Sequence, residues 1–428
     1  MFEKNIISSR LPYTNIFLYT TLIIFFSLGI FLRLELLDNV LIHQFLTRDF
    51  DRTFNLFEGN YIPLAGAETT NGGRLPGPFL YFLMAIPLFI QKSYYSIFVF
   101  NFILNIGSVV GFFWVIKKYF GTSEGVVATV LALISLPHMG AVHFPINPAF
   151  IFPFVPLFLY LFFEFAINKN AKFIPYIILV VSLGIQLHYS VATLYFVPIA
   201  FFCIFRQKIP LKTVFVSALV ALVCFAPYII HKQTSFVPQS SGNKVIKGLD
   251  RYPTEKAIKI PFLGNTIERI TIDNNYRWKI PKAEKIGWVY YAVTTLSFWF
   301  LLFYVLIKCR KNGAQNYRKE IAVLTLFYVP SLIYELSGPG PSYWYAFIFV
   351  MPHTLLISYS FNLFFRKVNT SLYKVIIVGV ISSTIIFLTW GTFKHINSTN
   401  RVEGFVLWDY KKVKKFYITL TKKLNLSV

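Results

Sequence analysis

The chain has 428 residues, of which 56% are hydrophobic and only 14% are charged. Apolar runs of about 20 residues are needed to cross a hydrocarbon core of roughly 30 Å, and such runs recur along the whole sequence. This pattern excludes a soluble domain, and the lack of short alternating segments excludes a membrane β-barrel. We therefore predict an all-α polytopic membrane protein with about eleven transmembrane helices.

The formal net charge is +23. In a membrane protein, cytoplasmic loops rich in Lys and Arg and contacts with anionic lipids account for such a charge. No basic–aromatic motif for nucleic acid stands out, so membrane lipids and not nucleic acid are the expected partners. The three cysteines, Cys203, Cys224 and Cys309, suggest neither a disulfide nor a metal cluster.

The first apolar run extends from Ile16 to about Leu32 and follows Lys4 and Arg10. It is too long for the core of a signal peptide, and no small-residue cleavage site follows it. We expect an uncleaved first span with the N-terminus in the cytoplasm.

An acidic outside loop, residues 35–90, comes next and ends in the apolar run 79–90. That run is too short to cross a bilayer, so it is predicted to be an interfacial helix. The further spans are predicted at residues 96–116, 124–142, 150–167, 173–187, 191–205, 214–230, 287–307, 321–336, 345–365 and 375–390.

The spans divide the chain into four parts. We expect an N-terminal transmembrane module at 1–231, an outside basic loop at 232–285, C-terminal transmembrane helices at 286–390 and a basic tail at 391–428.

The distribution of charge supports this topology. The short loops HFPINPAF, QLHYS and SGPGPSYWY contain no Lys or Arg, whereas the loops between them are rich in both, as the positive-inside rule requires. Counting 79–90 as a crossing would reverse every later loop. The loop 232–285 and the tail are basic although they fall outside, and long translocated segments are less bound by the rule. We expect a protein of a bacterial cytoplasmic (inner) membrane.

The first outside loop combines acids and bases. Asp49 and Asp51 stand close to Arg48, and Arg74 follows before the interfacial run. A carboxylate suits a general base that deprotonates an acceptor hydroxyl, and arginines suit a phosphate leaving group. The residues alone leave open whether this is a reaction site for a lipid-linked phosphate or a solvated charged loop.

The motifs of the loop are RD at 48–49, EGNYIPLAG at 58–66 and GGRLPGPFLYFL at 72–83, joined by QLHY at 186–189. This pattern resembles the first outside loop of the GT-C glycosyltransferases, in the branch of the protein O-mannosyltransferases and the lipid A aminoarabinose transferase. The resemblance covers the architecture of the first 290 residues or so. It implies a hexosyl- or pentosyltransferase that uses a polyprenyl-phosphate sugar as donor. The acceptor is a hydroxyl or phosphate of a glycan, lipid or protein on the outer (periplasmic) face.

The resemblance also implies roles for residues. Asp49 matches the family's early loop aspartate as the base, and Asp51 is the alternative because relatives have Asp-Glu where this chain has Asp-Phe-Asp. Arg74 and Arg48 are expected to bind the donor phosphate, although Arg74 also fits an interfacial anchor. The residues expected to contact the acceptor or line the cavity are Glu58, Tyr61, Gln186, His188, Tyr189 and Tyr343.

For some of these residues a purely structural role remains an alternative. His188 also fits an ordinary interfacial histidine, and Tyr343 also fits an aromatic belt. No resident metal or organic cofactor is predicted, and an assisting divalent cation is the alternative.

Two other functions remain compatible with the sequence. One is a glycolipid transporter or flippase, although few ionisable residues fall within the spans. The other is a glycan ligase or polymerase of the same fold, which would differ in using a preassembled oligosaccharide donor.

Overall fold

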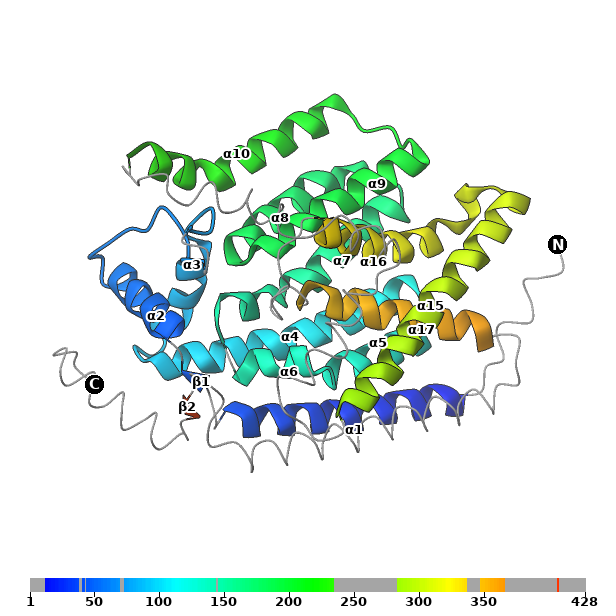
Figure 1. Ribbon diagram of the computed structural model, residues 1–428, viewed down its shortest axis with the longest axis horizontal. Helices are drawn as coiled ribbons and strands as arrows, with labels where there is room; N and C mark the ends of the chain where they lie inside the picture. The colour runs from blue at the N-terminus through cyan, green and yellow to red at the C-terminus, as the bar shows by residue number, and fades with distance from the viewer. Residues whose placement is uncertain are drawn as a thin grey trace.

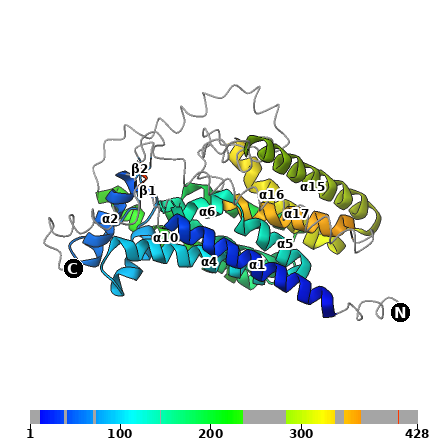
Figure 2. The same cartoon turned by 90° about the horizontal axis from the view of Figure 1, so that it is seen from below.

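The computed structural model describes residues 12–37, 41–42, 44–69, 73–143, 145–234, 283–336, 347–365 and 406–407. Within this part the chain is a bundle of long helices, with α2 (Gln44–Phe57) and α3 (Phe79–Ala85) packed together at one end of it (Figure 1). A second view shows α15 (Ala283–Asn312), α16 (Arg318–Leu336) and α17 (Val350–Phe365) as a group on one side of the bundle (Figure 2).

The remaining α-helices are α1 (Pro12–Leu37), α4 (Tyr94–Tyr119), α5 (Thr122–Leu133), α6 (Leu136–His143), α7 (Phe154–Ala166), α8 (Ile174–Leu187), α9 (Phe196–Phe205) and α10 (Leu211–Thr234). The 3-10 turns are η1 (Ile86–Phe89), η2 (Asn147–Ile151), η3 (Ala171–Phe173), η4 (Tyr189–Tyr195) and η6 (Ala314–Tyr317). One antiparallel pair joins β1 (Leu41–Ile42) to β2 (Val406–Leu407), which brings the tail beside the start of the first loop.

Six helical stretches in the described part are long and apolar enough to cross a membrane. They are 16–34, 94–119, 147–166, 211–234, 292–312 and 347–365, and the shorter apolar stretches are 79–89, 122–133, 171–187 and 189–205. The polytopic all-α fold is therefore confirmed. The count of eleven spans stays a prediction, because 345–346 and 375–390 lie outside the described residues.

The span predicted as one helix over 124–142 is divided in two. Helix α5 ends at Leu133 and α6 begins at Leu136. Pro137 explains the break, since it has no N–H to donate to the carbonyl of Leu133 and its ring would collide with that group. The backbone N–H of Ser135 bonds to Ala132 instead, in a tight turn between the two helices.

Helix α2 was not anticipated within the outside loop. Its apolar residues Leu46, Phe50, Phe54 and Phe57 recur at helical spacing and form one face. Phe50 packs 5.1 Å from the Tyr94 ring, and Phe54 lies 4.6 Å from the same ring, measured between centroids. The burial of this face against the start of α4 fixes the rotation of α2 and hence the direction of its charged side chains.

The run 79–90 forms the short helix that the sequence predicts, as α3 followed by η1. Leu80, Tyr81 and Met84 are buried, whereas Phe89 and Ile90 are 80% and 90% exposed. An outward apolar face of this kind suits a helix lying in a membrane surface, and that location stays a prediction.

At the opposite end of the bundle, loops predicted to share the cytoplasmic side meet one another. Lys118 in the last turn of α4 pairs with Glu164 near the end of α7, with Nζ and Oε1 2.6 Å apart. Lys319 at the start of α16 donates to the Tyr119 carbonyl at 2.9 Å. These contacts place the basic loops together, away from α2 and α3.

Candidate active site

Helix α2 presents its charges on two sides. Arg48 and Arg52 are four residues apart and therefore project from the same face. Asp49 is turned further inward and is only 4% exposed. Thr53, one turn beyond Asp49, donates its hydroxyl to the Asp49 carbonyl at 2.8 Å.

A small hairpin follows α2 and carries Glu68 and Arg74 on its two arms. The two residues form an antiparallel bridge, and the Gly66 N–H and Leu75 N–H each donate across it at 2.9 Å. Gly66 is required there, because a Cβ at this position would lie 2.6 Å from the Gly77 carbonyl oxygen. The hairpin thus holds Glu68 and Arg74 next to each other.

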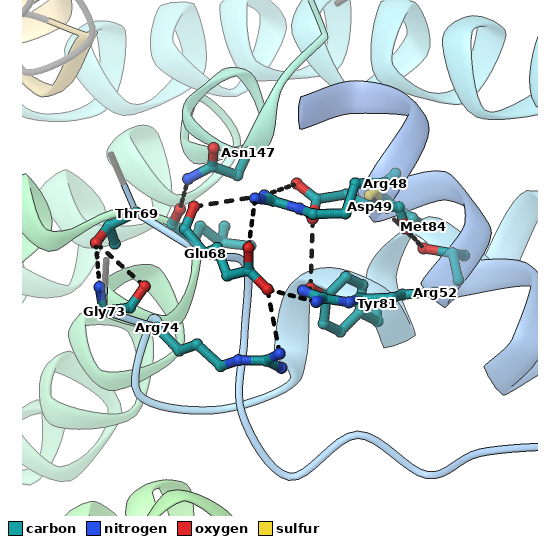
Figure 3. A network of polar contacts seen from close by, with 12 residues as sticks. Arg48, Asp49, Arg52, Glu68, Thr69, Gly73, Arg74, Tyr81, Met84 and Asn147 are labelled. Atoms are coloured by element: carbon teal, nitrogen blue, oxygen red, sulfur yellow. Dashed lines mark hydrogen bonds and ion pairs between the residues drawn. The ribbon is translucent and has the colours of Figure 1, made fainter. Parts of the chain in front are cut away.

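Three arginines converge on the Glu68 carboxylate (Figure 3). Arg52 and Arg74 approach Oε1 at 2.5 and 3.2 Å, and Arg48 approaches Oε2 at 3.2 Å. We call Arg48, Arg52 and Arg74 the arginine cradle. It unites two separate parts of the sequence around one anion.

Asp49 lies beside the arginine cradle and accepts two hydrogen bonds from the Arg48 guanidinium, at 3.0 and 3.2 Å. The Tyr81 hydroxyl of α3 lies 3.4 Å from Asp49 Oδ1 and also accepts from Arg52 at 3.2 Å. Burial raises the pKa of the Asp49 carboxyl to about 6, against the opposing effect of Arg48. Such a carboxylate is ionised at neutral pH and is a stronger base than an exposed aspartate.

The structure separates Asp51 from Asp49. Two residues along a helix correspond to a rotation of about 200°, and Asp51 is exposed and accepts from the Tyr94 hydroxyl at 2.9 Å. Glu58 is likewise outside the arginine cradle, in an ion pair with Lys92 at 2.7 Å. Tyr61 is 45% exposed.

Gln186 and Tyr189 anchor the loop that carries Arg74. Gln186 Oε1 accepts from the Phe79 N–H at 3.1 Å, and its Nε2 donates to the Cys224 carbonyl at 2.8 Å, which joins α3 to α8 and α10. The Tyr189 hydroxyl donates to the Arg74 carbonyl at 2.7 Å. These two residues act on the site through the backbone of the loop.

His188 contacts Ser190, a close neighbour in the sequence. It accepts from the Ser190 N–H and lies 2.9 Å from the Ser190 hydroxyl, so it caps the turn η4. These contacts are compatible with the structural role that the sequence left open for His188, and a role at the acceptor stays a prediction.

Sequence reasoning found Arg48, Asp49 and Arg74 but missed three neighbours, Arg52, Glu68 and Tyr81. The spacing of Arg48 and Arg52 is a helical signal that would have added Arg52. Glu68 lies in the charged loop and Tyr81 in the motif at 72–83, but neither was predicted as a site residue, because their approach to α2 depends on the hairpin and on helix packing. Tyr343 and most of the loop 232–285 lie outside the described residues. Among the residues described, no group of three His, Cys, Asp or Glu side chains is placed to hold a metal ion.

Residues 76–231 match the family model of the dolichyl-phosphate-mannose-protein mannosyltransferases. The match begins two residues after Arg74, so it includes Tyr81, Gln186 and Tyr189 but not the arginine cradle or Asp49. No curated protein matches the chain in sequence.

Solved structures extend the comparison over most of the chain. The apo oligosaccharyltransferase of Archaeoglobus fulgidus is 12% identical with a TM-score of 0.54, over 88% of this chain and 56% of that one. The same protein in complex with Zn and sulfate is 11% identical with a TM-score of 0.51, over 86% and 53%. The chain has the GT-C fold.

Another structure with the GT-C fold, ArnT from Cupriavidus metallidurans bound to undecaprenyl phosphate, is 10% identical, with a TM-score of 0.49 and coverage of 87% and 73%. The chain spans just over half the length of the oligosaccharyltransferase chains it matches. The two oligosaccharyltransferase structures confirm, at the level of fold, the resemblance to GT-C proteins that the loop motifs indicate.

Proposed function

We propose that the protein transfers a sugar from a polyprenyl-phosphate donor to an acceptor at the face of the membrane where α2 and α3 lie. The observation that carries this proposal is the buried carboxylate of Asp49 directly beside the arginine cradle, at one end of an apolar bundle. A base and a phosphate site are the two components that such a transfer needs. The family match over 76–231 supports the same reaction class.

The proposed reaction is a single displacement at the anomeric carbon, with inversion. The acceptor oxygen forms a bond to that carbon as the bond to the phosphate oxygen breaks. Asp49 takes the proton of the acceptor hydroxyl, and the departing polyprenyl phosphate carries the electron pair away. The three guanidinium groups stabilise the charge that develops on the phosphate.

The finer assignment is part of the proposal. The acceptor is a hydroxyl or phosphate of a glycan, lipid or protein, and the sugar is a hexose or pentose. The site faces the periplasm of a bacterial inner membrane, with the N-terminus in the cytoplasm. Gln186 and Tyr189 hold the loop of Arg74, and Tyr61 and Glu58 are proposed to contact the acceptor and not the donor phosphate. A divalent cation that assists the phosphate is compatible with this scheme.

The test uses the purified chain in liposomes with a radiolabelled polyprenyl-phosphate hexose and candidate acceptors. Asp49→Asn is expected to reduce transfer by about 100-fold or more, because the amide cannot take the proton. Asp51→Asn is the matched comparison, since it removes the same charge from the exposed side of α2 and should keep most of the transfer. Thermal melting and gel filtration check that both variants stay folded.

Transfer that survives Asp49→Asn would remove Asp49 as the base. Movement of the labelled lipid across the bilayer without any transfer, in wild-type protein, would favour a flippase instead. Use of an oligosaccharide donor in preference to the monosaccharide would favour a ligase.

A further inference from the structure

The residue at the centre of the arginine cradle is a carboxylate of the protein itself. Glu68 uses both of its oxygens, Oε1 for Arg52 and Arg74 and Oε2 for Arg48. The hydrogen bond from Arg52 holds the pKa of the Glu68 carboxyl below its usual range, so this group is ionised at neutral pH. Several guanidinium groups around a single anion also match the way in which proteins bind a phosphate.

Contacts other than those with Glu68 hold the side chains of Arg48 and Arg52 and the backbone of Arg74. Arg48 bonds to Asp49 at 3.0 Å, and Arg52 donates to the Tyr81 hydroxyl at 3.2 Å. The loop that carries Arg74 is fixed by the bond from Tyr189 to its carbonyl at 2.7 Å. Glu68 is therefore not the only group that positions these three arginines.

Glu68 also differs from Asp49 in its exposure. The Glu68 side chain is 40% accessible to solvent, whereas that of Asp49 is 5% accessible. The Glu68 carboxylate already contacts water, so solvation can offset the ion pairs that it loses on turning outward, while Asp49 is enclosed. Among the described residues in direct ion pairs here, three arginines face the carboxylates of Asp49 and Glu68, and this excess of arginines attracts a further anion.

We propose that Glu68 is the resident anion of the arginine cradle and that the phosphate group of the lipid donor displaces it. This inference rests on the proposed function, since it concerns the donor site of the same reaction. With the donor bound, its phosphate takes the guanidinium bonds and Glu68 turns to solvent. A lipid alcohol without phosphate has no means to displace the carboxylate, so Glu68 makes the site selective for phosphate.

The exchange also has a consequence after transfer. The donor is a phosphate diester with one negative charge, whereas the released polyprenyl phosphate is a monoester with up to two. The product would therefore bind the arginine cradle more tightly than the donor on charge alone. Return of the Glu68 carboxylate competes with the product and favours its release.

The experiment measures the affinity of undecaprenyl phosphate for the purified full chain in nanodiscs. Glu68→Gln keeps the shape of the side chain and removes its charge, so binding should tighten by about tenfold. Inhibition of transfer by added undecaprenyl phosphate should become stronger by a similar factor. Undecaprenol, which lacks the phosphate, should not gain affinity in this variant.

Glu58→Gln is the matched control for this binding measurement. It removes one negative charge from the same loop, at a residue paired with Lys92 and not with the arginine cradle. Lipid phosphate affinity should change by less than about twofold in this variant, as expected for a screened exposed charge. A thermal melt of Glu68→Gln that matches wild type shows that the arginine cradle and hairpin remain folded.

Weaker or unchanged binding in Glu68→Gln would overturn the inference and make Glu68 a support for the arginines. Arg52→Gln separates this outcome from failure of the proposed function. If Arg52→Gln weakens lipid phosphate binding while Glu68→Gln does not tighten it, only the role of Glu68 is wrong. If Arg52→Gln leaves binding unchanged, the arginine cradle is not the donor site, and the proposed function fails together with the inference.

Discussion

The two ends of the bundle use basic residues in opposite ways. At the α2–α3 end, Arg52 and Arg74 share one oxygen of an exposed carboxylate. At the other end, Arg318 donates to the Ala166 carbonyl at 2.6 Å and to the Gln207 side chain at 2.6 Å, and lies over the Phe205 ring at 4.4 Å. The first arrangement presents guanidinium groups to an incoming anion. In the second, the guanidinium of Arg318 is engaged in bonds that hold helix ends together.

The bonding partners of the arginines explain the difference between the two ends. The Ala166 carbonyl lies at the end of α7, where it has no partner within its own helix, so Arg318 satisfies a buried group that cannot leave. Glu68 is a side chain that water can also solvate. A high content of Lys and Arg therefore says little about function in this protein until the partner of each cation is known.

The largest expected effect comes from neutralising one arginine at each end. Arg52→Gln should lower sugar transfer by about 100-fold, since a group that stabilises the leaving phosphate is lost. Arg318→Gln should leave transfer per folded molecule near the wild-type value and destabilise the protein by about 2 kcal/mol, the worth of hydrogen bonds from a charged group. Transfer assays and thermal melts on the same preparations measure both quantities.

The comparison fails if the two variants exchange their effects. A stable Arg318→Gln protein that has lost transfer would place function at the α16 end. An Arg52→Gln protein that melts early and keeps its specific activity would make the arginine cradle structural.

The pH dependence of transfer is the next largest effect. Asp49 acts as a base only when it is ionised, and burial raises its pKa to about 6. Transfer should therefore rise through pH 6 and level off above it, with a loss of about tenfold for each unit well below the midpoint. Tyr81→Phe removes a hydrogen bond that favours the ionised carboxylate, so it should move the midpoint to higher pH.

A rate profile under saturating donor and acceptor, from pH 4.5 to 8, measures the midpoint. Asp51→Asn should leave it in place. A midpoint near 4 in wild type, or one that Asp51→Asn moves, would assign the titrating group to an exposed carboxylate instead.

The smallest effect is expected at Tyr189. Tyr189→Phe removes the hydroxyl that bonds to the Arg74 carbonyl and leaves the guanidinium intact. Because Tyr189 only positions the loop, donor affinity should fall by about threefold, equivalent to part of one neutral hydrogen bond, with little change in the rate at saturating donor. A matching fall in the saturated rate would show that Tyr189 contacts the reacting groups.

Much of the candidate site could be predicted from the sequence. The motifs around Arg48-Asp49 and Arg74 located the loop, and QLHY at 186–189 was correctly joined to it. Which of Asp49 and Asp51 lies beside the arginine cradle could not be predicted in this way, because it depends on the rotation of α2. That rotation is set when Phe50 and Phe54 pack on Tyr94. The contacts of Glu68 and Tyr81 with Arg52 could not be predicted for a similar reason, because a hairpin and a second helix bring these residues to α2.

The sequence by itself determined that this is a polytopic helical membrane protein with a charged loop after its first span, because apolar run length and loop charge act locally along the chain. Pro137 also breaks the helix locally, because it lacks a backbone donor, although the apolar run had predicted a single span over 124–142. The tertiary structure alone decided which charges meet. The convergence of three arginines on Glu68, and the enclosure of Asp49 beside them, require surfaces from α2, α3 and the intervening hairpin to pack together.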